Sequence, residues 1–228
     1  MMFHLRRRAF LQLTAAGAAA CWAGGTLAGA QAAAMGDPLI SPGARRSKVR
    51  VAKVYLGIPN AHWPTPAMDL AREMEVYEDA FAQRAAAFGD VEFPVNQLVT
   101  TVEGAQEAAT KLAGMDGVLA IHLSMGVTPM LQKILAAGTP TMLFAAPYSG
   151  HEWTHFGQIM RNPEGALLDC VLTSDLDQLA AAVRPFRAMH HLREAKIVNV
   201  SERESSAEYL QAVRTKFGTE IVRIERDR

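Results

Sequence analysis

The sequence predicts an α/β protein with a doubly wound, mostly parallel sheet and helices on both of its faces. Short runs rich in β-branched residues alternate with segments in which apolar residues recur at helical spacing. One run, GVLAIHL at 117–123, is apolar on both faces, as is typical of a buried parallel strand. Such an alternation places the strands side by side, with the helices packed against them.

The first part of the chain after residue 30 predicts a flexible leader, a strand and a long helix. Residues 31–48 hold proline and glycine without a sustained period and read as the leader. Residues 49–56 (VRVAKVYL) form the first strand. Thr65 as N-cap and Pro66 at the first helical position open the helix, whose apolar face includes Leu70 and Phe81 and which ends at Gly89.

The middle of the chain repeats this alternation. Strands are predicted at 91–100, 117–123 and 140–146, separated by a helix over 102–113 and a second helix that Thr128 caps and Gly138 ends. A fifth strand follows at 167–172. Ser174 then caps a helix, with Asp177 three residues on, and Pro185 must kink or split that helix.

The last segment predicts a strand at 196–200, a helix at about 206–217 and a strand at 220–224. We interpret residues 49–192 as an amino-terminal α/β domain and residues 193–228 as the first βαβ unit of an incomplete second α/β domain. The alternative is that the last strands extend the first sheet.

Composition excludes several classes of protein. The 228 residues have a formal net charge of +0, and 50% of them are hydrophobic, which is too high a fraction for a disordered chain. The balanced charge provides no attraction to nucleic acid, so no such partner is expected. Two cysteines cannot form a disulfide framework.

Residues 1–30 predict a twin-arginine signal peptide. Arg6 to Arg8 precede a weakly apolar stretch that ends in the small residues AGA at 28–30, and RRAFLQ at 7–12 matches the twin-arginine core. We expect the twin-arginine translocase to export the protein to the periplasm or the exterior. An uncleaved membrane anchor and a lipoprotein site at Cys21 are the alternatives. Cleavage after Ala30 would remove three of the 23 basic residues, leaving a slightly acidic body with Cys170 as its one cysteine.

Ligands of a doubly wound sheet bind outside the carboxyl ends of its strands. The loops predicted at that edge are 57–64, 124–128 and 147–155, and they are rich in aromatic and polar side chains suited to a sugar or polyol. The alternative is that the tryptophans only pack these loops onto the helices. The candidate substrate-binding residues are His62, Trp63, Ser124, Tyr148, Ser149, His151, Glu152 and Trp153.

Other chemistry-bearing residues have simpler interpretations. HEWTH at 151–155 spells H-E-x-x-H, but glycines on both sides leave barely two turns, so a zinc protease is disfavoured. We expect His122 to be a satisfied core or strand-end residue and Cys170 a small core residue. His190 and His191 suit the C-terminus of a helix as dipole partners. The nearby arginines, Arg184, Arg187 and Arg193, suit a solvated or interdomain face.

Three segments resemble the amino-terminal part of proteins related to L-fucose and L-arabinose isomerases: PYSGHEW (147–153), FRAMHHLREAKIVNV (186–200) and KFGTEIVRIERDR (216–228). The resemblance covers about residue 49 to the end. It implies homo-oligomers that interconvert aldoses and ketoses with Mn²⁺ or a similar divalent metal, held by two carboxylates and a histidine of later domains.

The resemblance therefore assigns no catalytic residue, metal ligand or cofactor to this chain. It makes His62, Trp63, His151, Glu152 and Trp153 candidates for substrate contact. We expect this chain to be the substrate-shaping, amino-terminal part of an exported sugar-isomerase-like protein. By itself the chain should be inactive. The alternative is an exported periplasmic binding protein for a sugar or small solute, which the export signal suits directly.

Overall fold

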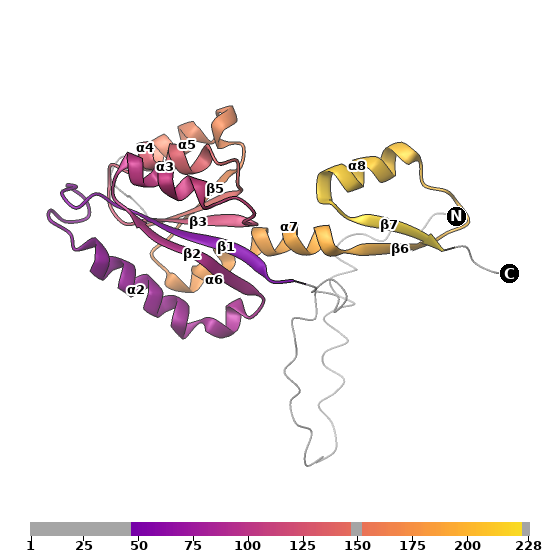
Figure 1. Cartoon of the computed structure of the whole chain (residues 1–228), viewed down its shortest axis with the longest axis horizontal. Coiled ribbons are helices and arrows are strands. Elements are labelled where there is room, and N and C mark those ends of the chain that lie inside the picture. The colour runs from indigo at the N-terminus through magenta and orange to yellow at the C-terminus, as the bar shows by residue number, and fades with distance from the viewer. Residues whose placement is uncertain (1–46, 147–151, 225–228) are drawn as a thin grey trace, which may run out of the picture. The chain divides into compact units, whose positions relative to one another are not determined.

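The computed structural model describes residues 47–146 and 152–224. The predicted signal peptide and nearly all of the predicted leader lie outside these ranges. The larger sheet has five strands in the order β2-β1-β3-β4-β5, and every neighbouring pair is parallel (Figure 1). Its strands are β1 (Val49–Leu56), β2 (Val91–Val99), β3 (Gly117–His122), β4 (Thr141–Ala145) and β5 (Leu168–Leu172).

Helices cover both faces of this sheet, so the predicted doubly wound α/β fold is confirmed (Figure 1). One face carries α3 (Val102–Thr110), α4 (Thr128–Leu135) and α5 (Glu152–Ile159). The opposite face carries α2 (Leu70–Gln83) and α6 (Leu179–Ala182). Short 3-10 turns also occur in the connections: η2 (Ala85–Phe88), η3 (Pro163–Gly165) and η4 (Leu176–Gln178).

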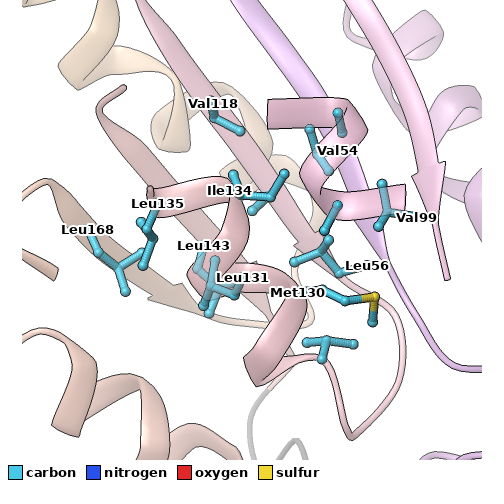
Figure 2. Close-up of a cluster of buried hydrophobic side chains, with 14 of the residues drawn as sticks. Val54, Leu56, Val99, Val118, Met130, Leu131, Ile134, Leu135, Leu143 and Leu168 are labelled. Atoms are coloured by element: carbon cyan, nitrogen blue, oxygen red, sulfur yellow. The ribbon is translucent and has the colours of Figure 1, made fainter. Parts of the chain in front are cut away.

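The core consists of two apolar clusters, one on each face of the sheet. Alternate residues of β1 supply both, with Val54 in one cluster and Tyr55 in the other. Figure 2 shows the first cluster, in which Leu131 and Ile134 of α4 lie among side chains of the strands. Full burial of one such aliphatic side chain contributes about 1.5–3 kcal/mol, so this packing fixes α4 on the sheet.

The long helix begins later than the sequence predicts. It starts at Leu70 rather than after Thr65, and its N-cap is Asp69, whose carboxylate accepts a hydrogen bond from the amide of Arg72 at 3.0 Å. Ala67 has a φ of 56°, a left-handed conformation that no helix starting at Thr65 could contain. The threonine and proline therefore lie in the exposed loop between β1 and α2.

The predicted break at Pro185 is confirmed. Helix α6 ends at Ala182, and α7 (Arg184–Glu194) begins with the proline in its first turn, where the missing amide hydrogen costs nothing. The predicted cap is one residue off, because the Asp175 carboxylate, not the Ser174 hydroxyl, accepts a hydrogen bond from the amide of Asp177.

The last segment forms β6 (Lys196–Val200), α8 (Ala207–Phe217) and β7 (Glu220–Ile224), as the sequence predicts. β6 and β7 pair in parallel as a separate two-stranded sheet and do not extend the five-stranded one. Helix α7 crosses the predicted domain boundary at residue 192, since it continues to Glu194. No helix within the described residues combines the length and the apolar character needed to cross a membrane.

Candidate functional site

The carboxyl ends of β1 and β3 bring two of the predicted loops together. The Ser124 hydroxyl accepts a hydrogen bond from the amide of Ile58 at 2.6 Å and donates one to the carbonyl of the same residue at 3.1 Å. The amide of Met125 donates to the carbonyl of Trp63 at 3.1 Å. These bonds hold the β1–α2 loop against the β3–α4 loop. Ser124 is fully buried, so its role is to position the two loops.

Glu152, the first residue of α5, caps the N-terminus of α4. One carboxylate oxygen accepts hydrogen bonds from the amide and the hydroxyl of Thr128, at 2.6 and 2.7 Å, and the other accepts one from the amide of Gly126 at 2.8 Å. The residue at the N-cap position is Val127, which has no polar side chain. The sequence predicts Thr128 as the cap, but Thr128 is the first helical residue and the capping carboxylate comes from another helix.

Glu152 is ionised at neutral pH. Its burial by itself raises the pKa, but hydrogen bonds from His122, from Thr128 and from the amide of Gly126 outweigh the burial and lower the pKa to about 2. The partial positive charge at the N-terminus of α4 favours the same charged state. The backbone amides of Gly126 and Thr128 are therefore occupied by the protein's own carboxylate.

His122, at the end of β3, is the buried partner of Glu152. Its Nε2 lies 3.1 Å from a carboxylate oxygen of Glu152, and since an ionised carboxylate only accepts, Nε2 must carry the hydrogen. The ring lies between Trp63, with centroids 5.8 Å apart, and Phe156, at 5.7 Å in a T-shaped arrangement. The sequence predicts a satisfied core or strand-end histidine, but Nδ1 is buried and has no hydrogen-bond partner in the part of the chain that the structure describes. Neutral imidazole therefore leaves a lone pair on Nδ1.

The structure separates the remaining predicted site residues. His62 is exposed, and Trp63 is half-buried against the ring of His122. Trp153 is 46% exposed and belongs to a different groove of about 400 Å³, which Cys170 and Leu172 of the edge strand β5 also line. Cys170 is half-buried, because it packs against the first core cluster and also lines this groove. The predicted Tyr148, Ser149 and His151 lie outside the described residues.

A depression of about 290 Å³ opens over the N-terminus of α4. Thr128, Glu152 and the exposed His155 are its polar lining, and Met125 and Pro129 supply apolar surface. Glu152 and His155 also belong to the H-E-x-x-H letters. Because both carboxylate oxygens of Glu152 are bound to α4 and His122, this glutamate is placed differently from the base of a zinc protease.

A second polar cluster, which sequence reasoning missed, joins α7 to the amino ends of the strands. Asp90, just before β2, binds Arg187 at 3.0 Å and His191 at 3.0 Å. Asp116, just before β3, binds His190 at 2.9 Å and Arg193 at 3.1 Å. The sequence places these arginines on a solvated or interdomain face, and Arg193 is indeed half-exposed, whereas Arg187 is 20% exposed and paired with Asp90. The two histidines, expected as dipole partners at the helix end, bind aspartates.

The carboxyl group of Asp90 is held in its ionised form. Burial raises its pKa, but the hydrogen bond from His191 and the hydrogen bond and charge of Arg187 outweigh that effect and lower the pKa. No local signal in the sequence could reveal these pairs, since Asp90 and His191 are 101 residues apart. The cluster lies at the amino ends of the strands, away from the rim that holds His122.

No protein-family model matches the chain. A comparison with curated proteins likewise finds no significant match. The chemistry of the chain must therefore be inferred from its own residues, chiefly the buried pair of His122 and Glu152 at the rim and the histidine–aspartate cluster on α7.

Proposed function

We propose that the rim formed by the β1–α2 loop, the β3–α4 loop and α5 binds a small hydroxyl-bearing ligand, a sugar or a polyol. In this proposal the chain is the substrate-shaping, amino-terminal part of an exported aldose–ketose isomerase-like protein. The observation that carries the proposal is His122, whose Nδ1 is buried without a hydrogen-bond partner among the described residues, at the edge of a doubly wound sheet where ligands bind.

The pair of His122 and Glu152 defines the chemistry of that position. The carboxylate fixes the hydrogen on Nε2, so Nδ1 can accept a hydrogen bond from a ligand hydroxyl. An unsatisfied buried acceptor costs about 1–3 kcal/mol, and a ligand hydroxyl that reaches it recovers that energy. Glu152 itself acts as a positioning residue, because its oxygens already accept four hydrogen bonds.

Trp63 supplies the apolar surface that a sugar ring requires. Of the two rings packed on His122, Phe156 is 1% exposed within α5, whereas Trp63 is half-buried on a loop. In this proposal a ligand reaches Nδ1 when Trp63 moves, and the indole face then stacks on the ligand. Met125 and Ser124 hold the two loops together while this side chain rearranges.

The described rim does not fit the metal centre that the isomerase resemblance implies. Such a centre needs two carboxylates and a histidine, whereas Glu152 and His122 are already hydrogen-bonded to each other and Glu152 to the N-terminus of α4. We therefore derive no isomerisation step for these residues. The proposed role is ligand binding.

Tryptophan fluorescence tests the proposal. The full chain with Trp22→Phe and Trp153→Phe, which keeps Trp63 as its one tryptophan, is titrated with L-fucose, L-arabinose and a polyol. Calorimetry on the unmodified chain gives the affinity. We expect saturable binding in the millimolar range, about −4 kcal/mol, with a change in Trp63 emission. Trp63→Ala should weaken binding at least about tenfold, while Trp153→Ala, the matched control, leaves it unchanged.

Two results would contradict parts of the proposal. Equal binding by the Trp63→Ala and Trp153→Ala variants would show that the ligand site is not at His122. Turnover in a coupled ketose assay with Mn²⁺ by this chain alone would refute the substrate-shaping role. Submicromolar affinity for one sugar would instead favour an exported binding protein.

A further inference from the structure

Helix α5 and the edge strand β5 line a groove that the proposed rim does not use. Its volume is about 400 Å³, and small-ligand pockets usually measure about 300–1,000 Å³. Trp153, Met160 and Leu172 line the groove and are 46%, 40% and 46% exposed. Apolar side chains scattered singly over a surface are ordinary, whereas several that gather in one hollow mark a site of interaction. The groove is therefore a candidate binding site for an apolar body.

Gly157 leaves bare backbone in the wall of this groove. It lies inside α5, four residues after Trp153 and four before Arg161, and all three residues line the groove. A Cβ at Gly157 would meet nothing within 4 Å. Glycine inside a helix costs stability relative to alanine, and no close neighbour among the described residues requires its small size. The missing side chain leaves room for a flat ring between Trp153 and Arg161.

The charge of the groove favours an anionic group on the ligand. Among the described residues that line the groove, Arg161 is the one that carries a charge, and its exposed guanidinium has no carboxylate partner in the described part of the chain. The planar guanidinium binds carboxylates through two parallel hydrogen bonds. Burial and the charge of Asp169 raise the pKa of the Cys170 thiol to about 11, so this lining residue is neutral.

The edge of β5 beside the groove favours a small molecule over an extended peptide. A peptide that binds at a sheet edge adds a strand by accepting hydrogen bonds from the edge amides. The amide of Cys170, in the middle of β5, already donates to the Asp169 carboxylate at 2.8 Å. A charged side chain that occupies an edge amide in this way protects the edge against added strands.

We propose that this groove binds a small planar aromatic carboxylate. Its ring lies over the bare backbone at Gly157 and against the indole of Trp153, and its carboxylate pairs with Arg161. Such a ligand differs from the hydroxyl-rich ligand proposed for the rim. Gly157 and Arg161 do not belong to the rim, so either proposal can fail without the other.

Calorimetry on the full chain with two related probes tests the charge preference. Naphthoate carries the carboxylate, and naphthylmethanol has the same rings without the charge. We expect naphthoate to bind with a dissociation constant below about 1 mM, and naphthylmethanol to bind at least about tenfold more weakly. Arg161→Gln should reduce naphthoate affinity to that of the alcohol. Arg203→Gln, another exposed arginine, is the matched control and should bind both probes as the unmodified chain does.

Filling the groove tests its position. Gly157→Leu places a side chain in the open space and replaces glycine with a better helix former, so it should weaken naphthoate binding at least about tenfold without lowering the melting temperature. Circular dichroism checks that each variant is folded, and Arg161→Gln decides the matter if Gly157→Leu is not. Naphthoate affinity that neither substitution changes would overturn the proposal. Equal affinity of the unmodified chain for the two probes, or binding of neither, would also overturn it.

Discussion

The carboxylate of Glu152 caps the helix that begins at Thr128, although the two residues are 24 positions apart. It accepts hydrogen bonds from both the amide and the hydroxyl of Thr128, a role that a residue adjacent in sequence normally fills. The same carboxylate fixes the hydrogen of His122. One side chain therefore joins α4, α5 and β3 at the proposed ligand-binding edge.

Replacing this carboxylate should destabilise the protein. Glu152→Gln removes the negative charge at the N-terminus of α4 and turns an amide NH₂ towards hydrogen-bond donors, so we expect a loss of about 1–3 kcal/mol. Urea denaturation followed by circular dichroism at neutral pH measures the loss. Glu164→Gln, an exposed residue, is the control, and equal stability of the two variants would disprove the capping role.

The capping carboxylate should also make the free energy of unfolding depend on pH in the acidic range. Its pKa falls from an ordinary 4.5 to about 2 in the folded protein, so its ionised form stabilises the fold above about pH 4.5. This stabilisation is lost as the pH falls towards 2, and it amounts to about 3 kcal/mol at most. The free energies of unfolding of wild type and Glu152→Gln should therefore converge between about pH 5 and pH 2.5. A constant difference would contradict the assigned pKa.

Substituting alanine for glycine should have opposite effects on stability at two positions. A Cβ at Gly117 would lie 2.2 Å from the ring of Phe186, which is 2% exposed, so Gly117→Ala should cost about 1–3 kcal/mol through overpacking. A Cβ at Gly157, inside α5, would meet nothing within 4 Å, and Gly157→Ala should stabilise by up to about 1 kcal/mol. Thermal unfolding of the two variants and the unmodified chain measures both changes in stability. A stabilising Gly117→Ala would show that α7 does not pack on β3 as described.

A buried ion pair on the α2 face provides a further test. The Lys53 side chain is 6% exposed, and its ammonium lies 2.6 Å from both carboxylate oxygens of Glu78. Oε1 of Glu78 also accepts a hydrogen bond from the Tyr55 hydroxyl. Glu78→Gln leaves the ammonium buried without its counter-charge and should cost about 2–3 kcal/mol. The double variant Lys53→Met/Glu78→Gln should recover most of that loss in urea denaturation. If it is no more stable than the single variant, the ammonium is not the source of the cost.

Local patterns in the sequence were sufficient for most of the fold. The strands were predictable because runs of β-branched residues such as 49–56 are bounded by turn residues, and the split at Pro185 follows from its missing amide hydrogen. The start of α2 was predicted wrongly because Thr65 and Asp69 are both good caps. The choice between them depends on the backbone at Ala67, which the sequence does not reveal.

The candidate site was less predictable. The loops that form the rim follow from strand order, but the roles of Glu152 and His122 depend on a contact between residues 30 apart. The aspartate partners of α7 are farther away still, 74 residues for His190. A residue type such as histidine at a helix end is compatible with a dipole contact, an ion pair or a metal ligand, and only the fold distinguishes them.

The strand order has a consequence for how the chain folds during its synthesis. After β1 and β2 pair, the strands β3, β4 and β5 each join the growing sheet in the order in which the ribosome delivers them. The bonds from α7 back to Asp90 and Asp116 can form only at the end of this sequence. Until α7 emerges, Asp90 and Asp116 at the amino edge of the sheet lack the histidine and arginine partners that α7 supplies, so these ion pairs form last.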